Sequence, residues 1–136
     1  MDHSMVNYTI NRLAESLHEH AGLLSEASRY ALLAKSRPQD PTVACKILEV
    51  LESLRGLRER MIEDARLLLD SVGSIGDEEI EDVKALAGYY LVAAYKEEIE
   101  FLSSISGVVD VSRDLRDAET LAGILGRLTR GHQPSP

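Results

Sequence analysis

Apolar residues recur at helical spacing along most of the chain. From Ser4 to Lys35, one apolar row repeats every seven residues and a second row lies three positions further on, which predicts an amphipathic helix. The first row consists of Ile10, Leu17, Leu24 and Ala31, and the second of Leu13, Ala27 and Ala34. Charged residues occupy the positions between the rows, so we expect this helix to bury one face and solvate the other.

The segment from Pro41 to Val72 repeats the same pattern. Asp40 precedes it as an N-cap residue, and Pro41 stands at the first helical position, where the missing N–H of proline is harmless. Gly73 follows the last apolar residue and predicts a left-handed C-cap. The main apolar row of this second helix consists of Ile47, Leu54, Met61 and Leu68.

A third helix is predicted to begin near Asp77, where a run of acidic residues suits the positive end of the helix dipole. Its middle, residues 85–95, is apolar nearly all round. Because a helix that is apolar on every side is buried on every side, we expect a second chain to cover this stretch. The residues that we assign to this interface are Tyr89, Tyr90, Leu91 and Tyr95.

A shorter fourth helix is predicted from Ser112 to Arg130. No segment alternates with period two, and the cluster Val108–Val111 is one short extended candidate without a mate. The sequence therefore predicts an all-α fold, an antiparallel bundle of three long helices plus a shorter fourth helix. We expect a single domain over residues 1–131, followed by a disordered tail at 132–136.

Composition narrows the function classes. The chain has 136 residues, of which 44% are hydrophobic, and its formal charge is 15 − 23 = −8. An acidic chain disfavours nucleic acid and anionic membrane surfaces as partners. No apolar run is long enough to cross a bilayer, and the opening residues lack a signal-peptide pattern, so we expect a cytoplasmic protein. The single Cys45 is expected to be a buried thiol, and the few amide side chains are typical of a thermophilic source.

Polar residues interrupt the predicted apolar seams at a few positions. His20 occupies the row between Leu13 and Ala27, and three further polar residues lie on or beside seams of the other helices: Arg58, Asp64 and Glu97. If these four met in one layer, they would form either a small-molecule or metal site inside the bundle or a buried pair that fixes helix register. The sequence leaves both possibilities open, because it does not set the order of the helices.

The acidic run that opens the third helix is a second candidate site. Glu78 and Asp82 stand four residues apart on one helix face, a spacing at which carboxylates can share a hard cation. Long antiparallel helices with acids at this spacing resemble, over residues 10–105, the bundles of phosphate-uptake regulators of the PhoU kind. The resemblance implies that the acidic signature of that family maps once, to Glu78 and Asp82; the second copy of the signature is missing here.

The sequence contains two further short motifs, one in each terminal helix. Glu15 and His18 form one Glu-x-x-His, whereas a di-iron bundle uses two. Arg127 and His132 match the spacing used by small helical nucleases of the HEPN kind, although Gly131 interrupts the helix between them. No complete catalytic set, nucleophile elbow or phosphate loop is visible.

We therefore expect a non-enzymatic helical bundle that acts as an interaction or regulatory module and self-associates into a homo-oligomer through its third helix. No cofactor is indicated. A ligand- or metal-binding bundle is the alternative, and a small HEPN-like nuclease is a further alternative.

Overall fold

The computed structural model describes residues 3–130, and this part of the chain consists of helices joined by short turns, without a strand. The all-α prediction is confirmed. The helices are α1 (His3–Ser36), α2 (Pro41–Asp70), α3 (Asp77–Tyr89), α4 (Tyr95–Ile105) and α5 (Ser112–Arg130), with a 3-10 turn η1 (Val72–Ser74) and a π-helical turn η2 (Tyr90–Ala94). Because α3, η2 and α4 follow one another without a break, they form a single long rod, the third helix of the bundle.

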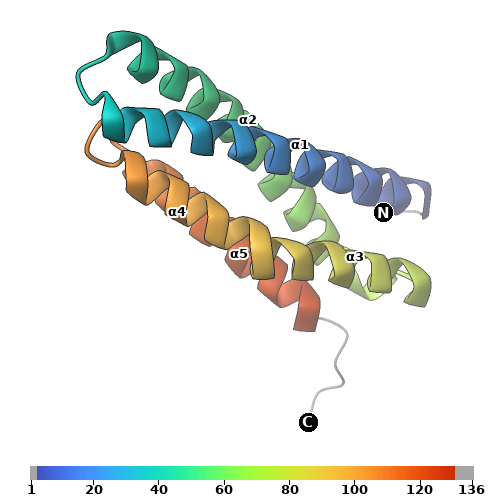
Figure 1. The fold of residues 1–136 in the computed structure, drawn as a ribbon. Coiled ribbons are helices and arrows are strands. Elements are labelled where there is room, and N and C mark those ends of the chain that lie inside the picture. Colours follow the sequence, from blue (N-terminus) through green and yellow to red (C-terminus); the bar gives the residue numbers. More distant parts are fainter. Residues whose placement is uncertain (1–2, 131–136) are drawn as a thin grey trace.

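Successive long helices run in opposite directions (Figure 1). Helix α1 packs on α2, α2 packs on α5, α5 packs on the α3–η2–α4 rod, and the rod returns to α1. Each helix therefore has two neighbours around one shared interior, and the predicted arrangement of three long helices and a shorter fourth is confirmed.

The turns between helices follow local chemistry. The side chain of Asp40 accepts a hydrogen bond from the backbone N–H of Thr42 at 2.9 Å, and Pro41 opens α2, as the sequence predicted. The predicted left-handed cap at Gly73 is wrong: no described glycine has positive φ, and α2 passes through Ser71 into the 3-10 turn η1 instead. The cluster Val108–Val111, an extended candidate in the sequence, forms the turn before α5 and pairs with no strand in the described part of the chain.

The π turn changes which residues of the third helix face the interior. Upstream, Val83 and Tyr90 are buried at the predicted seven-residue interval. A constant interval would next bury Glu97 and then Ser104, but Glu98 and Ile105 are buried in their place. A π turn contains more residues than an α turn. After it, the residue that faces the interior therefore comes one position later in the sequence than a constant seven-residue interval predicts. This one-residue shift decides the chemistry of the interior, as described below.

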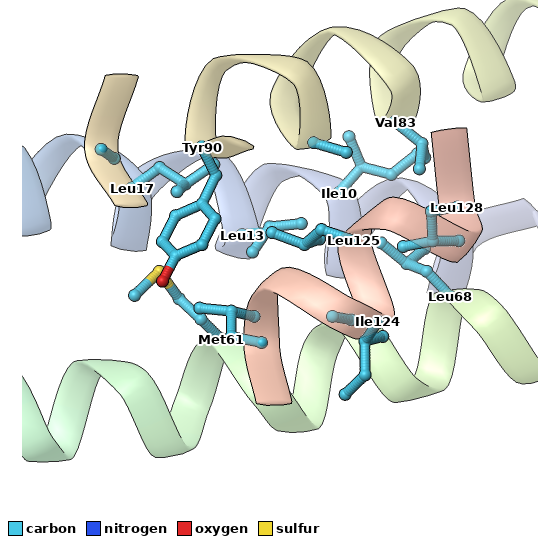
Figure 2. Close-up of a cluster of buried hydrophobic side chains, with 14 of the residues drawn as sticks. Ile10, Leu13, Leu17, Met61, Leu68, Val83, Tyr90, Ile124, Leu125 and Leu128 are labelled. Carbon is cyan, nitrogen blue, oxygen red and sulfur yellow. The ribbon is translucent and has the colours of Figure 1, made fainter. Parts of the chain in front are cut away.

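The interior consists of two separate apolar clusters, one toward each end of the bundle. The first cluster joins the N-terminal half of α1 to the C-terminal halves of α2 and α5 and to the α3–η2 segment. Figure 2 shows part of it, with Leu13, Leu125 and Leu128 in the middle and the ring of Tyr90 directed toward Met61. The second cluster joins the other halves of α1 and α2 to α4 and the start of α5.

Three further expectations concern the single cysteine, the C-terminal tail and membrane-spanning segments. Cys45 is an exposed thiol on α2, not a buried one, because it lies between the rows that face the interior. The predicted tail at 132–136 and His132 lie outside the described residues. Among residues 3–130, no helix combines the length and apolar character that a bilayer crossing requires.

Candidate functional site

The two apolar clusters are separated by a layer of buried polar side chains, one from each helix of the bundle. His20 comes from α1, Arg58 from α2, Glu98 from α4 and Asp114 from α5, and each is at most 1% exposed. Each occupies a position where its helix faces the interior, between the apolar residues of one cluster and those of the other. We call these four residues, together with Tyr90 and Arg55, which contact them, the polar layer.

Glu98 is the acceptor at the centre of the polar layer. Its Oε2 accepts hydrogen bonds from Nε2 of His20 at 3.0 Å and from Nε of Arg58 at 2.9 Å. Its Oε1 accepts a longer hydrogen bond of 3.3 Å from the hydroxyl of Tyr90, which stands two turns earlier in the same rod. Both carboxylate oxygens are thus satisfied without water. An ionised Glu98 requires that His20 carry a proton on Nε2.

Arg58 connects Glu98 to the fourth helix. Its Nη2 lies 2.8 Å from Oδ1 of Asp114, a contact that is close enough for an ion pair but not directional enough for a hydrogen bond. Arg55, one turn earlier on α2, donates to both carboxylate oxygens of Asp114 at 2.9 and 2.8 Å. Two guanidinium groups therefore face two carboxylates, and the charges of these four groups sum to zero.

These contacts move the pKa values of the acids in a consistent direction. Burial by itself would raise the pKa of Glu98, but its interactions with His20 and Arg58, hydrogen bonds among them, outweigh burial and hold that pKa below its ordinary value. The pKa of Asp114 is also lowered, because Arg55 and Arg58 outweigh its burial. Burial and the nearby charge of Glu98 raise the pKa of the Tyr90 hydroxyl, so Tyr90 stays neutral. Glu98 and Asp114 are therefore both ionised at neutral pH.

His20, Arg58, Glu98 and Asp114 are shielded from solvent, and only Arg55, at the edge of the polar layer, is partly exposed. Nδ1 of His20, Nη1 of Arg58 and Oγ of Ser16, one turn before His20, are buried without a hydrogen-bond partner in the described part of the chain. No substrate can reach these atoms while the helices stay packed, because the side chains that carry them are at most 1% exposed. The arrangement supplies electrostatic and geometric constraints between the four helices.

Of the four polar residues that interrupt the predicted apolar seams, His20 and Arg58 meet at Glu98. Glu97 is exposed and lies in a shallow groove between α4 and α1, because the π turn places Glu98 on the interior face in its place. Asp64 is buried, but it pairs with Arg12 of α1 at 3.1 Å within the first apolar cluster. Burial outweighs the charge of Arg12 and raises the pKa of Asp64.

Sequence analysis did not identify three members of the polar layer, Arg55, Glu98 and Asp114, and it assigned a fourth member, Tyr90, to the interface. For Glu98 a signal was available, since Ile105 is apolar and Ser104 is polar, which fits a shifted row better than a constant one. For Arg55 and Asp114 the sequence holds no such signal, because an Arg on a helix flank and an acid in a first turn are both ordinary surface features.

The predicted metal residues are not brought together. Glu78 and Asp82 are exposed side chains in the first turns of α3. Within residues 3–130, no group of three or more His, Cys, Asp or Glu side chains is arranged to hold a metal ion. Arg127 of the nuclease motif is exposed near the end of α5. The second residue of that motif, His132, lies outside the described residues.

The predicted interface residues divide into two kinds. Tyr90 is fully buried within a single chain, where its hydroxyl donates a hydrogen bond to Glu98. Its side chain is therefore not accessible to a second chain. Leu91 and Tyr95 are partly buried against the first apolar cluster. Tyr89 remains 44% exposed, and its neighbour on the same outer face, Val92, is 80% exposed. The single chain therefore covers most, but not all, of the apolar segment 85–95.

Comparison with family models, with curated proteins and with solved structures found no match for this chain.

Proposed function

We propose that this chain is a non-enzymatic helical-bundle module that self-associates through the outer face of the α3–η2 segment. The observation that carries the proposal is the exposure of Tyr89 and Val92 beside Ala85 on a helix whose other faces are packed. Large apolar side chains that gather on one outer face are typical of an interaction surface.

The polar layer supports this proposal from the interior. The buried polar side chains join all four helices. A shift of α2, α4 or α5 would separate Arg58 from Glu98 or Asp114, and a shift of α1 would break the hydrogen bond between His20 and Glu98. A scaffold fixed in this way presents its outer surface in a constant geometry. The four central side chains of the layer are at most 1% exposed, so we place the function on the surface.

We also propose a cytoplasmic location. Cys45 is an exposed free thiol, and a reducing compartment keeps such a thiol reduced.

The oligomeric state tests the main proposal directly. Sedimentation velocity of the full chain over a range of micromolar concentrations should show a concentration-dependent oligomer. Val92→Asp should shift the distribution to monomer, since it places a charge in the apolar contact. Leu32→Asp is the matched control: Leu32 is 70% exposed on α1, far along the sequence from the proposed face, so this variant should associate as the unmodified chain does.

Far-UV circular dichroism should confirm that both variants keep their helix content, because both side chains are solvent-exposed. A chain that sediments as a monomer at every concentration would refute the proposal. So would an oligomer that Val92→Asp and Leu32→Asp weaken equally.

A further inference from the structure

Two buried atoms on α1 lack a hydrogen-bond partner although their chemistry is complementary. Within residues 3–130, neither Nδ1 of His20 nor Oγ of Ser16 is hydrogen-bonded, and both side chains belong to residues at most 1% exposed. His20 follows Ser16 by four residues, which places the two side chains on the same face of the helix. A buried polar atom without a partner costs free energy, and native structures pair nearly all of them.

The tautomer of His20 makes Nδ1 a hydrogen-bond acceptor. Nε2 carries the proton that ionised Glu98 accepts at 3.0 Å, so the other nitrogen of a neutral imidazole has only its lone pair. The charges of the two guanidinium groups and two carboxylates of the polar layer already sum to zero, and a neutral ring keeps that balance. The ring of Tyr90 lies 6.0 Å from the imidazole, but its hydroxyl donates to Glu98. Nδ1 of His20 therefore needs a donor from elsewhere.

Ser16 differs from other hydroxyl side chains of α1. Oγ1 of Thr9 donates to the carbonyl oxygen of Met5 at 2.7 Å, and Oγ of Ser28 donates to that of Leu24 at 2.9 Å. Bonds of this kind to the preceding turn are the ordinary way in which a helical hydroxyl is satisfied. Ser16 forms no such bond, so its O–H is available to a group other than the backbone of its own helix.

The spacing of the two side chains suits one small bridging molecule. Side chains four residues apart on a helix have Cβ atoms about 5–6 Å from each other, and no direct hydrogen bond joins Nδ1 of His20 to Oγ of Ser16. A water molecule offers what both atoms need, a donor for Nδ1 and an acceptor for the hydroxyl. An ion in this place would add a charge to a layer that is already balanced. The chemistry of the pair therefore points to a neutral ligand.

We propose that Ser16 and His20 hold one buried water molecule, which donates to Nδ1 and accepts from the hydroxyl of Ser16. The water holds Nδ1 as the acceptor and so fixes the tautomer in which Nε2–H serves Glu98. Ser16 is thus a positioning residue of the polar layer, and it acts on Glu98 through the water and the imidazole. This inference concerns the interior of one chain and does not depend on the proposed self-association.

The sign of the effect of Ser16→Ala tests the proposal. If the hydroxyl holds a water molecule, alanine leaves that water and Nδ1 of His20 with fewer partners, and the equilibrium constant for folding should fall about tenfold. An unchanged or raised constant would overturn the proposal. It would mean that the hydroxyl is unpaired, because removing an unpaired buried group and adding a better helix former both favour the folded chain.

Ser28→Ala is the matched control on the same helix. It removes the same hydroxyl group, but that hydroxyl bonds to its own helix and not to the polar layer. The equilibrium constant for folding should therefore change by less than about threefold. Urea denaturation of both variants and of the unmodified chain, at one protein concentration, provides the comparison.

Nuclear magnetic resonance of the full chain, labelled with nitrogen-15, identifies the water molecule itself. At about pH 8 an ordinary imidazole is neutral, and the ring of His20 should show an unprotonated Nδ1 and a protonated Nε2. Magnetisation transfer from a long-lived water molecule to the protons of Ser16 and of the His20 ring should appear in the unmodified chain and be lost in Ser16→Ala. A protonated Nδ1, no transfer from water, or a crystal structure with a direct bond between the two side chains would overturn the proposal.

Discussion

Replacing Glu98 by glutamine should destabilise the fold more than any other single change of one charged side chain into its amide. Its Oε2 accepts two hydrogen bonds, one from Nε2 of His20 and one from the guanidinium Nε of Arg58. Each hydrogen bond to a charged group contributes about 1.5–3 kcal/mol. The amide oxygen of glutamine can take the place of Oε2 and accept both bonds, but it lacks the negative charge that strengthens them, and Arg58 loses one of its two buried carboxylate partners. We therefore expect Glu98→Gln to lower the free energy of unfolding by about 3–5 kcal/mol at neutral pH.

Glu97→Gln is a control on the adjacent residue. It removes the same charge from the same helix, but Glu97 is exposed and faces a groove, so the change should stay within about 0.5 kcal/mol. Urea denaturation followed by circular dichroism, at one fixed protein concentration, measures both. In thermal unfolding, the Glu98 variant should lose roughly 10–20 °C relative to the control.

The result that would refute this reasoning is equality of the two variants. If Glu98→Gln and Glu97→Gln differed by less than about 1 kcal/mol, the polar layer would not constrain the helices in the way proposed. The double variant Glu98→Gln with Arg58→Met gives an independent check. Because each substitution removes a partner of the other, their combined cost should be smaller than the sum of the two single costs.

Two further predictions concern acid and metal ions. Since the folded pKa of Glu98 lies below its unfolded value, the stability that Glu98 contributes is complete above the unfolded pKa and is lost as pH falls through the folded pKa. We expect the free energy of unfolding to fall below about pH 4, and Glu98→Gln to flatten this dependence; an unchanged acid limb in the variant would contradict the assignment. Asp64, whose pKa is raised, contributes in the opposite sense and offsets part of the loss. For metal ions, Glu78 and Asp82 are exposed and belong to no group of three ligands in the described residues, so Mn²⁺, Mg²⁺ or Zn²⁺ should not raise the midpoint of thermal unfolding. A stabilisation that saturates with ion concentration would favour the metal-binding alternative.

The helices could be predicted from the sequence because their apolar rows keep a constant period over several turns. His20 and Arg58 could be identified as candidate buried polar residues for the same reason: each interrupts a row that is otherwise apolar. The error at Glu97 has a definite physical cause. Extrapolation along the third helix assumes a uniform helical turn, and the π turn at Tyr90–Ala94 breaks that assumption just before the polar position.

The partners of the buried residues could not be predicted, because pairing depends on which helices are neighbours. Asp114 meets Arg55 and Arg58 only because α5 lies beside α2, far away in the sequence. Similarly, the composition of the third helix shows that it carries many apolar side chains, but it does not show which of them face the interior and which stay exposed. Tyr90 is needed inside the chain and Tyr89 is not, and only the packing of the rod against α1 and α5 separates these two adjacent tyrosines.

A charged layer between two apolar clusters has a consequence for how this protein can change over evolutionary time. Within either cluster, one aliphatic residue can replace another of similar volume at small cost, and the two ends of the bundle can diverge independently. Glu98, Arg58 and Asp114 allow no such gradual substitution, because loss of one leaves an opposite charge stranded. Descendants of this chain should therefore either inherit the trio intact or exchange all of it for apolar residues, with few surviving intermediates.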